Sequence, residues 1–126
     1  ARKRFDEAID DLRSAVQAVP SSVLYLERLA DLLFHHGDAP GEGLSCLDRA
    51  LSLDAHDFTA RRPRGPFSPN RPRLLYKIAL FHAELGDFKA AAARADEALI
   101  VCSEPVIQEA ILHLRRDLQE AECDVP

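Results

Sequence analysis

The sequence contains no methionine and no tryptophan, and its three cysteines, Cys46, Cys102 and Cys123, stand far apart. An odd number of widely spaced cysteines gives neither a disulfide framework nor the close pairs of a zinc site. This usage fits a reducing, intracellular compartment best, and we expect a cytoplasmic protein. Because no methionine stands even at position 1, we also expect the chain to be a fragment of a longer product.

Long apolar runs are missing as well. No stretch approaches the roughly 20 apolar residues that a membrane-spanning helix needs, so we expect no membrane partner. The basic start, Ala1 to Arg4, is not followed by the apolar core of a signal peptide. The formal net charge of -5 argues against a general nucleic-acid binder. A length of 126 residues predicts one domain.

What the sequence does contain is helical periodicity. Apolar residues recur three or four positions apart, as on one face of an α-helix, and no stretch alternates with period two. The first run is typical, with Phe5, Ala8, Ile9, Leu12, Ala15, Val16 and Val19. The pattern predicts an all-α fold with helices over residues 2–19, 22–36, 41–54, 72–85, 88–102 and 104–122.

These predicted helices repeat one another. Each of two helix-to-helix corners carries a glycine and an aspartate, as expected where a glycine caps a helix end; the two corners are Gly37-Asp38 and Gly86-Asp87. The helices before the corners share a leucine eleven residues ahead of the glycine, at Leu26 and Leu75. Three of the other helices share two small residues seven apart, namely Ala8 and Ala15, Gly43 and Ala50, and Ala91 and Ala98.

In this joint pattern the chain resembles the tetratricopeptide repeat (TPR) family. The similar segments run from Phe5 to Pro20, from Leu26 to Asp54 and from Leu75 to Cys102. The resemblance implies a right-handed α-solenoid of antiparallel helix pairs. It is imperfect, because Ala50 and Ala98 are 48 residues apart, 14 more than the family period of 34. Ala55 and Ser103 also stand where the family usually has a closing proline.

On this register residues 1–126 form a single repeat domain. Residues 1–20 are the second helix of a truncated repeat, and residues 22–55 and 72–103 are repeats. The last helix, 104–122, is either a cap or the first helix of a degenerate repeat.

Residues 56–71 are then an insertion rich in proline and arginine. From Pro63 a proline recurs at every third residue, the period of polyproline II, at Pro63, Pro66 and Pro69 in the insertion and at Pro72 just after it. We expect an exposed loop without helix or strand. Pro66 to Arg71 also fits a proline-rich ligand of an adaptor domain, and Ser68 before Pro69 is a phosphorylation candidate. The alternatives are a tolerated insertion and, more weakly, an arginine contact with nucleic acid.

The resemblance also places a protein-binding surface. The first helix of each repeat lines the concave side of such an array, which here carries Glu27, Asp31, His35, Tyr76, Leu80 and Glu84. The predicted function is a protein–protein interaction scaffold that binds a peptide or helix of a partner in this groove. The alternative is a solvated face on a purely structural segment of a larger scaffold.

One specialised partner is disfavoured. Family members that clamp the terminal carboxylate of chaperones use lysine and asparagine on these helices. Here Glu27 and Asp31 would repel a carboxylate, and the only asparagine is Asn70, in the insertion. We therefore expect no carboxylate clamp, and a basic or mixed peptide suits this half of the groove better.

Nothing in the sequence predicts catalysis, a metal or a cofactor. His82 and His113 are isolated on their helices, and no cysteine stands at metal-ligand spacing from them. No glycine-rich phosphate loop and no nucleophile-elbow motif is present. We expect a non-enzymatic protein in which Cys46 and Cys102 fill the core.

Overall fold

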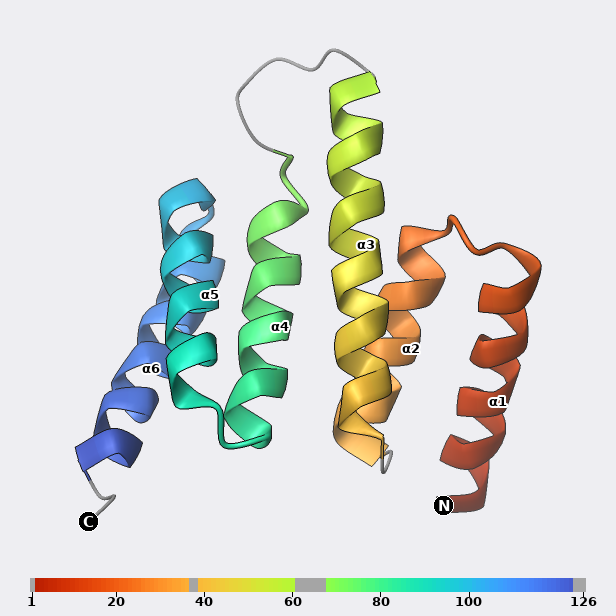
Figure 1. Cartoon of the computed structure of the whole chain (residues 1–126), viewed down its shortest axis with the longest axis horizontal. Helices are drawn as coiled ribbons and strands as arrows, with labels where there is room; N and C mark the ends of the chain where they lie inside the picture. Colours follow the sequence, from red (N-terminus) through yellow and green to blue (C-terminus); the bar gives the residue numbers. More distant parts are fainter. Residues whose placement is uncertain (1, 37–38, 61–67, 124–126) are drawn as a thin grey trace. The chain divides into compact units, whose positions relative to one another are not determined.

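The computed structural model describes residues 2–36, 39–60 and 68–123. Over these ranges the chain is all helical and contains no strand, which confirms the predicted all-α class (Figure 1). The helices are α1 (Arg2–Ala18), α2 (Val23–His36), α3 (Pro40–Ala60), α4 (Arg71–Glu84), α5 (Phe88–Val101) and α6 (Pro105–Cys123). Every predicted helix end lies within one residue of the observed one, except the end of α3.

Helix α3 corrects the predicted insertion. It continues to Ala60, so residues 56–60 are helical rather than part of a loop over 56–71. The physical reason is that no helix breaker occurs in this stretch before Pro63. The expected exposure of Ser68 is also wrong, because this side chain is only 6% exposed. Residues 61–67, with Pro63 and Pro66, lie outside the described residues.

Local hydrogen bonds and prolines explain several helix starts. Helices α3 and α6 begin at Pro40 and Pro105, where a missing N–H costs nothing and the fixed φ suits the first turn. The Ser22 Oγ accepts a hydrogen bond from the backbone N–H of Tyr25 at 3.3 Å and so caps α2.

The predicted corner between α4 and α5 is confirmed. Gly86 has a φ of 80°, the left-handed conformation that favours glycine. Its N–H donates to the Ala83 carbonyl at 3.1 Å, and the Asp87 N–H donates to the His82 carbonyl at 2.9 Å. This pair of bonds is the Schellman cap. The Asp87 Oδ1 then accepts from the Ala90 N–H at 3.2 Å and opens α5. The matching corner at Gly37-Asp38 lies outside the described residues.

The chain divides into two compact units, Ala1–Arg62 and Pro63–Pro126. In the first unit α2 packs against both α1 and α3 (Figure 1). One cluster of its core consists of Ile9, Leu29 and Leu33, and the half-buried Leu12, Val16, Leu32, Ala39 and Cys46 pack around them.

In the second unit α5 packs against both α4 and α6. The small residues Ala91 and Ala98 of α5 are 0% exposed, as their seven-residue spacing predicts. The turn into α6 is held by Gln108, whose Nε2 donates to the Cys102 carbonyl at 2.9 Å. Among the helices described, none combines the length and the apolarity needed to cross a membrane.

Candidate protein-docking site

A hollow in the first unit lies between α1 and α2. It has a volume of about 510 Å³ and is more apolar than polar. Its lining, the α1–α2 hollow from here on, consists of Ala8, Asp11, Leu12, Arg28, Asp31 and Leu32. Leu12 and Leu32 also pack against the core, so the floor of this hollow is fixed by the fold.

The rim of the α1–α2 hollow is charged. Asp11 and Arg28 are exposed, and Asp31 is half-buried. An apolar floor with charged groups of both signs around it is suited to an amphipathic segment, whose apolar side is buried and whose polar side meets the rim. The shallow form of the hollow and its leucine floor favour a protein segment over a small polar molecule.

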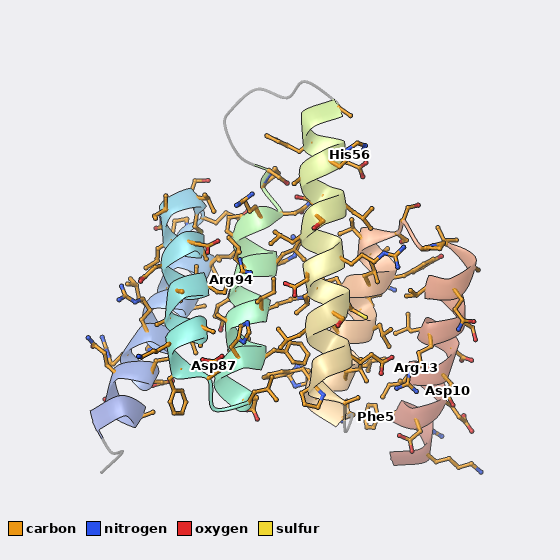
Figure 2. The ribbon with its side chains drawn as sticks, viewed as in Figure 1. Phe5, Asp10, Arg13, His56, Asp87 and Arg94 are labelled. Carbon is orange, nitrogen blue, oxygen red and sulfur yellow. The ribbon has the colours of Figure 1, made fainter. Side chains whose placement is uncertain are left out.

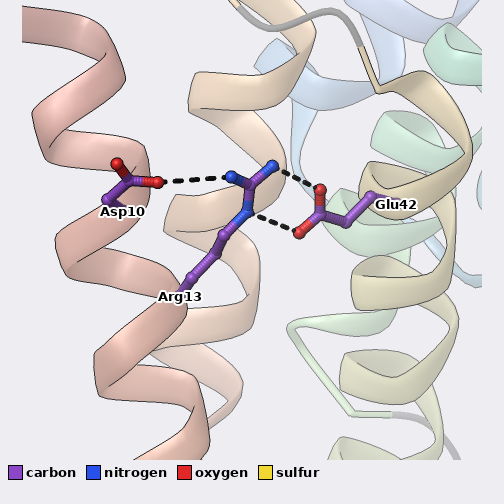
Figure 3. A network of polar contacts seen from close by, with 3 residues as sticks. All are labelled: Asp10, Arg13 and Glu42. Atoms are coloured by element: carbon purple, nitrogen blue, oxygen red, sulfur yellow. Dashed lines mark hydrogen bonds and ion pairs between the residues drawn. The ribbon is translucent and has the colours of Figure 1, made fainter.

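A second feature connects α1 to α3. The Arg13 guanidinium donates to both carboxylate oxygens of Glu42, from Nε to Oε1 at 2.9 Å and from Nη2 to Oε2 at 2.7 Å (Figure 3). Its third nitrogen, Nη1, lies 3.3 Å from Asp10 Oδ1 one turn earlier on α1. The pKa of Glu42 is lowered, chiefly by its hydrogen bond to Arg13, while partial burial opposes the shift.

Beside this ion pair lies a smaller and more polar hollow of about 340 Å³. Its lining, the Arg13 hollow from here on, consists of Asp6, Ile9, Asp10, Arg13, Leu33, His36 and Ala39. The side chains of Phe5, Asp10 and Arg13 lie along α1 in Figure 2. Phe5 stacks on the His36 ring with 3.5 Å between centroids and 8° between planes, which ties the start of α1 to the end of α2.

The structure places the predicted groove residues of α2 in three different environments. Asp31 lines the α1–α2 hollow. His35 is exposed, and its ring meets that of Phe34 edge-on with centroids 5.1 Å apart. Glu27 is 7% exposed, so it is buried rather than displayed on an open surface.

The other predicted groove residues belong to α4 in the second unit. Tyr76 and Leu80 are half-buried and Glu84 is exposed. Each unit is compact by itself, so a groove that combines these residues with Asp31 and His35 stays a prediction.

Cys46 and Cys102 carry free thiols. Burial first, and then the Glu42 carboxylate, raise the pKa of the Cys46 thiol, although Arg13 and Arg49 act in the opposite direction. A raised pKa keeps a larger share of the thiol in its protonated form, which is the less reactive one. The described residues contain no group of three or more histidine, cysteine, aspartate or glutamate side chains that could hold a metal ion.

Sequence reasoning missed the Arg13–Glu42 pair and both hollows. Arg13 and Glu42 are 29 residues apart, and no local spacing connects them. The one available signal for the α1–α2 hollow was the small Ala8, whose side chain leaves space on α1. For the Arg13 hollow, Asp6 and Asp10 stand four residues apart and so share a helix face.

No family model matches the chain, and a search of curated proteins finds no match either.

Proposed function

We propose that the protein is a non-enzymatic interaction scaffold that holds an amphipathic helix of a partner protein in the α1–α2 hollow. The observation that supports this most is the hollow itself, which combines the leucine floor of Leu12 and Leu32 with a charged rim. The hollow contains Asp31, which the TPR resemblance placed on the partner-binding surface.

A comparison of α1 with α5 indicates that the occupant of the hollow is a helix. Helix α5 packs against both α4 and α6, and its Ala91 and Ala98 are 0% exposed. Helix α1 carries Ala8 and Ala15 at the same spacing, but both are only half-buried. If α1 and α5 are copies in a repeat array, the small-residue face of α1 has room for one more helix.

The sequences of α2 and α4 indicate which residues a partner helix should carry. Helices α2 and α4 share a leucine, then a leucine or isoleucine three positions on, then an alanine. These positions are almost completely buried, at Leu26, Leu29, Ala30, Leu75, Ile78 and Ala79. A partner helix with apolar residues at this spacing would bury them on Ala8, Leu12 and Leu32, with polar residues toward Asp11 and Arg28.

We also propose that the protein is a TPR-like α-solenoid and that it acts inside the cell, in the cytoplasm. The free thiols of Cys46 and Cys102 are in keeping with a reducing compartment. The other described groove positions, His35, Tyr76, Leu80 and Glu84, would extend the contact if the two units share a surface. No chaperone carboxylate clamp, nucleic acid or membrane is part of the proposal.

A site-specific photo-cross-linker tests the proposal. Benzoylphenylalanine replaces Asp11, an exposed residue on the rim of the hollow, in one variant and the exposed Ala18 of the same helix in the other. Irradiation of cells that contain the protein should attach one defined segment of a partner at position 11 and not at position 18. Equal adducts at both positions, or none at position 11, would favour the alternative of a purely structural segment.

A further inference from the structure

The Arg13 hollow has an apolar floor and an acidic edge. Ile9 and Leu33 are 4% and 3% exposed, and with Ala39 they form its apolar part. Asp6 and Asp10 lie on the same face of α1, four residues apart, and both are exposed. A side chain that fits here needs an apolar stem and a positively charged end.

The guanidinium of Arg13, which also lines the Arg13 hollow, does not occupy this space. Arg13 gives two of its nitrogens to Glu42, at 2.9 and 2.7 Å, and the third lies 3.3 Å from Asp10. Arg13 is therefore shared between Glu42 and Asp10, and one guanidinium stands against the three carboxylates of Asp6, Asp10 and Glu42, which leaves an excess of two negative charges among these groups. The negative charges attract a cation, and Arg13 is held back from the space by its own bonds.

One wall of the Arg13 hollow is aromatic. His36 lines it, and the stack of His36 on Phe5, with 8° between the rings, holds the imidazole in place. A planar guanidinium can lie against an aromatic ring while its nitrogens bond carboxylates, which a tetrahedral ammonium does less well.

The geometry points to the Arg13 hollow as a receptor for one arginine side chain of a partner polypeptide. The aliphatic stem of that arginine lies on Ile9, Leu33 and Ala39. Its guanidinium meets the carboxylates of Asp6 and Asp10 beside the His36 ring. The Arg13 hollow and the α1–α2 hollow share no lining residue. The arginine site can therefore be tested independently of the proposed helix-docking function.

The test is a titration followed by NMR at the Ile9 and Leu33 methyl groups and the His36 ring. The probes are three blocked tripeptides, alanine–X–alanine, in which X is arginine, lysine or the neutral isostere citrulline. The arginine peptide should shift all three signals with a Kd on the order of 1 mM, as expected of a single side chain. Citrulline should leave the signals unchanged, and lysine should bind more weakly than arginine.

Two variants of α1 distinguish specific binding of arginine in the Arg13 hollow from a general attraction of cations to this acidic helix. Asp6→Asn removes a carboxylate from the Arg13 hollow, whereas Asp11→Asn removes an equal charge that lines the other hollow. Asp6→Asn should weaken arginine binding about threefold, the effect of one exposed ion pair. Asp11→Asn should leave the Kd almost unchanged. Both side chains are exposed, and a thermal melt checks that each variant folds.

Three outcomes would overturn the assignment. Equal shifts with arginine and citrulline would mean that charge plays no part. Equal binding of arginine and lysine would remove the guanidinium preference. An equal loss in Asp6→Asn and Asp11→Asn would show only general attraction of a cation to an acidic protein.

Discussion

Arg13 on α1 and Glu42 on α3 form a two-point ion pair, with nitrogen–oxygen distances of 2.9 and 2.7 Å. Two parallel hydrogen bonds fix the relative rotation of the two helices more firmly than a single contact between point charges would. The pair thereby holds the edge of the Arg13 hollow in place. Both side chains are partly exposed, at 42% and 35%, so solvent screens their attraction.

The first prediction concerns this pair. Glu42→Gln should lower the free energy of unfolding by about 1 kcal/mol at neutral pH, because it removes the ion pair and an acidic group from the first turn of α3. Asp48→Asn, an equal charge change at an exposed position of the same helix, is the control and should have little effect. Urea unfolding measures both.

The pH dependence of that difference follows from the lowered pKa of Glu42. Its folded-state pKa lies below the ordinary value of 4.5, so the folded protein binds this proton less readily than the unfolded chain. The contribution of Glu42 to stability is therefore complete above that value and is lost as the pH falls through the folded-state pKa. A difference between wild type and Glu42→Gln that grows on acidification would contradict this prediction.

The second prediction concerns Gly86. A Cβ there would meet no atom within 4 Å, so any cost of Gly86→Ala comes from the backbone φ of 80° alone. We expect a loss of about 1 kcal/mol, and about 1–3 kcal/mol for Gly86→Val. Gly41→Ala is the matched control, because Gly41 also has open space but lies within α3. It should stabilise the protein by about 0.5–1 kcal/mol. Equal effects of the two alanine substitutions would refute the cap.

The third prediction concerns packing between α4 and α5. Ala98 is 0% exposed and Ala93 is exposed. Ala98→Leu should therefore overpack the interface and cost about 1–3 kcal/mol, while Ala93→Leu should change stability little. Thermal melts of the two variants make the comparison, and equal losses would show that the register assigned to α5 is wrong.

The fourth prediction concerns Cys46. Because burial and Glu42 raise the pKa of its thiol, alkylation of Cys46 should reach half its maximal rate above pH 9.0, the ordinary value. The midpoint should fall in Glu42→Gln and in the urea-unfolded chain. Peptide mapping by mass spectrometry distinguishes Cys46 from the other cysteines. A midpoint below 9.0 in the folded wild type would contradict the assignment.

The helices were predictable because their signals are local. Pro40 and Pro105 mark two starts, and Gly86 marks a corner that the structure confirms with a positive φ. The predicted end of α3 is wrong because it follows the repeat period, which ends that helix at Asp54, and not the local sequence. The stretch from Ala55 to Ala60 contains no breaker, and the helix simply continues through it.

The candidate sites were less predictable because they depend on contacts between distant residues. Asp31 was identified as a surface residue from the repeat register, but its neighbours Ala8 and Leu12 come from another helix. Glu27 was predicted in the same groove and is buried instead. A spacing of four on one helix shows which residues share a face, but it does not show which helix will cover that face.

The helix-docking proposal is tested most directly by the affinity of the partner segment that the cross-linker at position 11 identifies. Isothermal titration would compare wild type with Ala8→Gln, which fills the α1–α2 hollow, and with Ala18→Gln, the same change at an exposed position of the same helix. Overpacking of about 1–3 kcal/mol predicts a Kd that is weaker by about 5-fold to 150-fold for Ala8→Gln. Ala18→Gln should bind like wild type. If Ala8→Gln also binds with the wild-type Kd, the α1–α2 hollow is not where the partner docks.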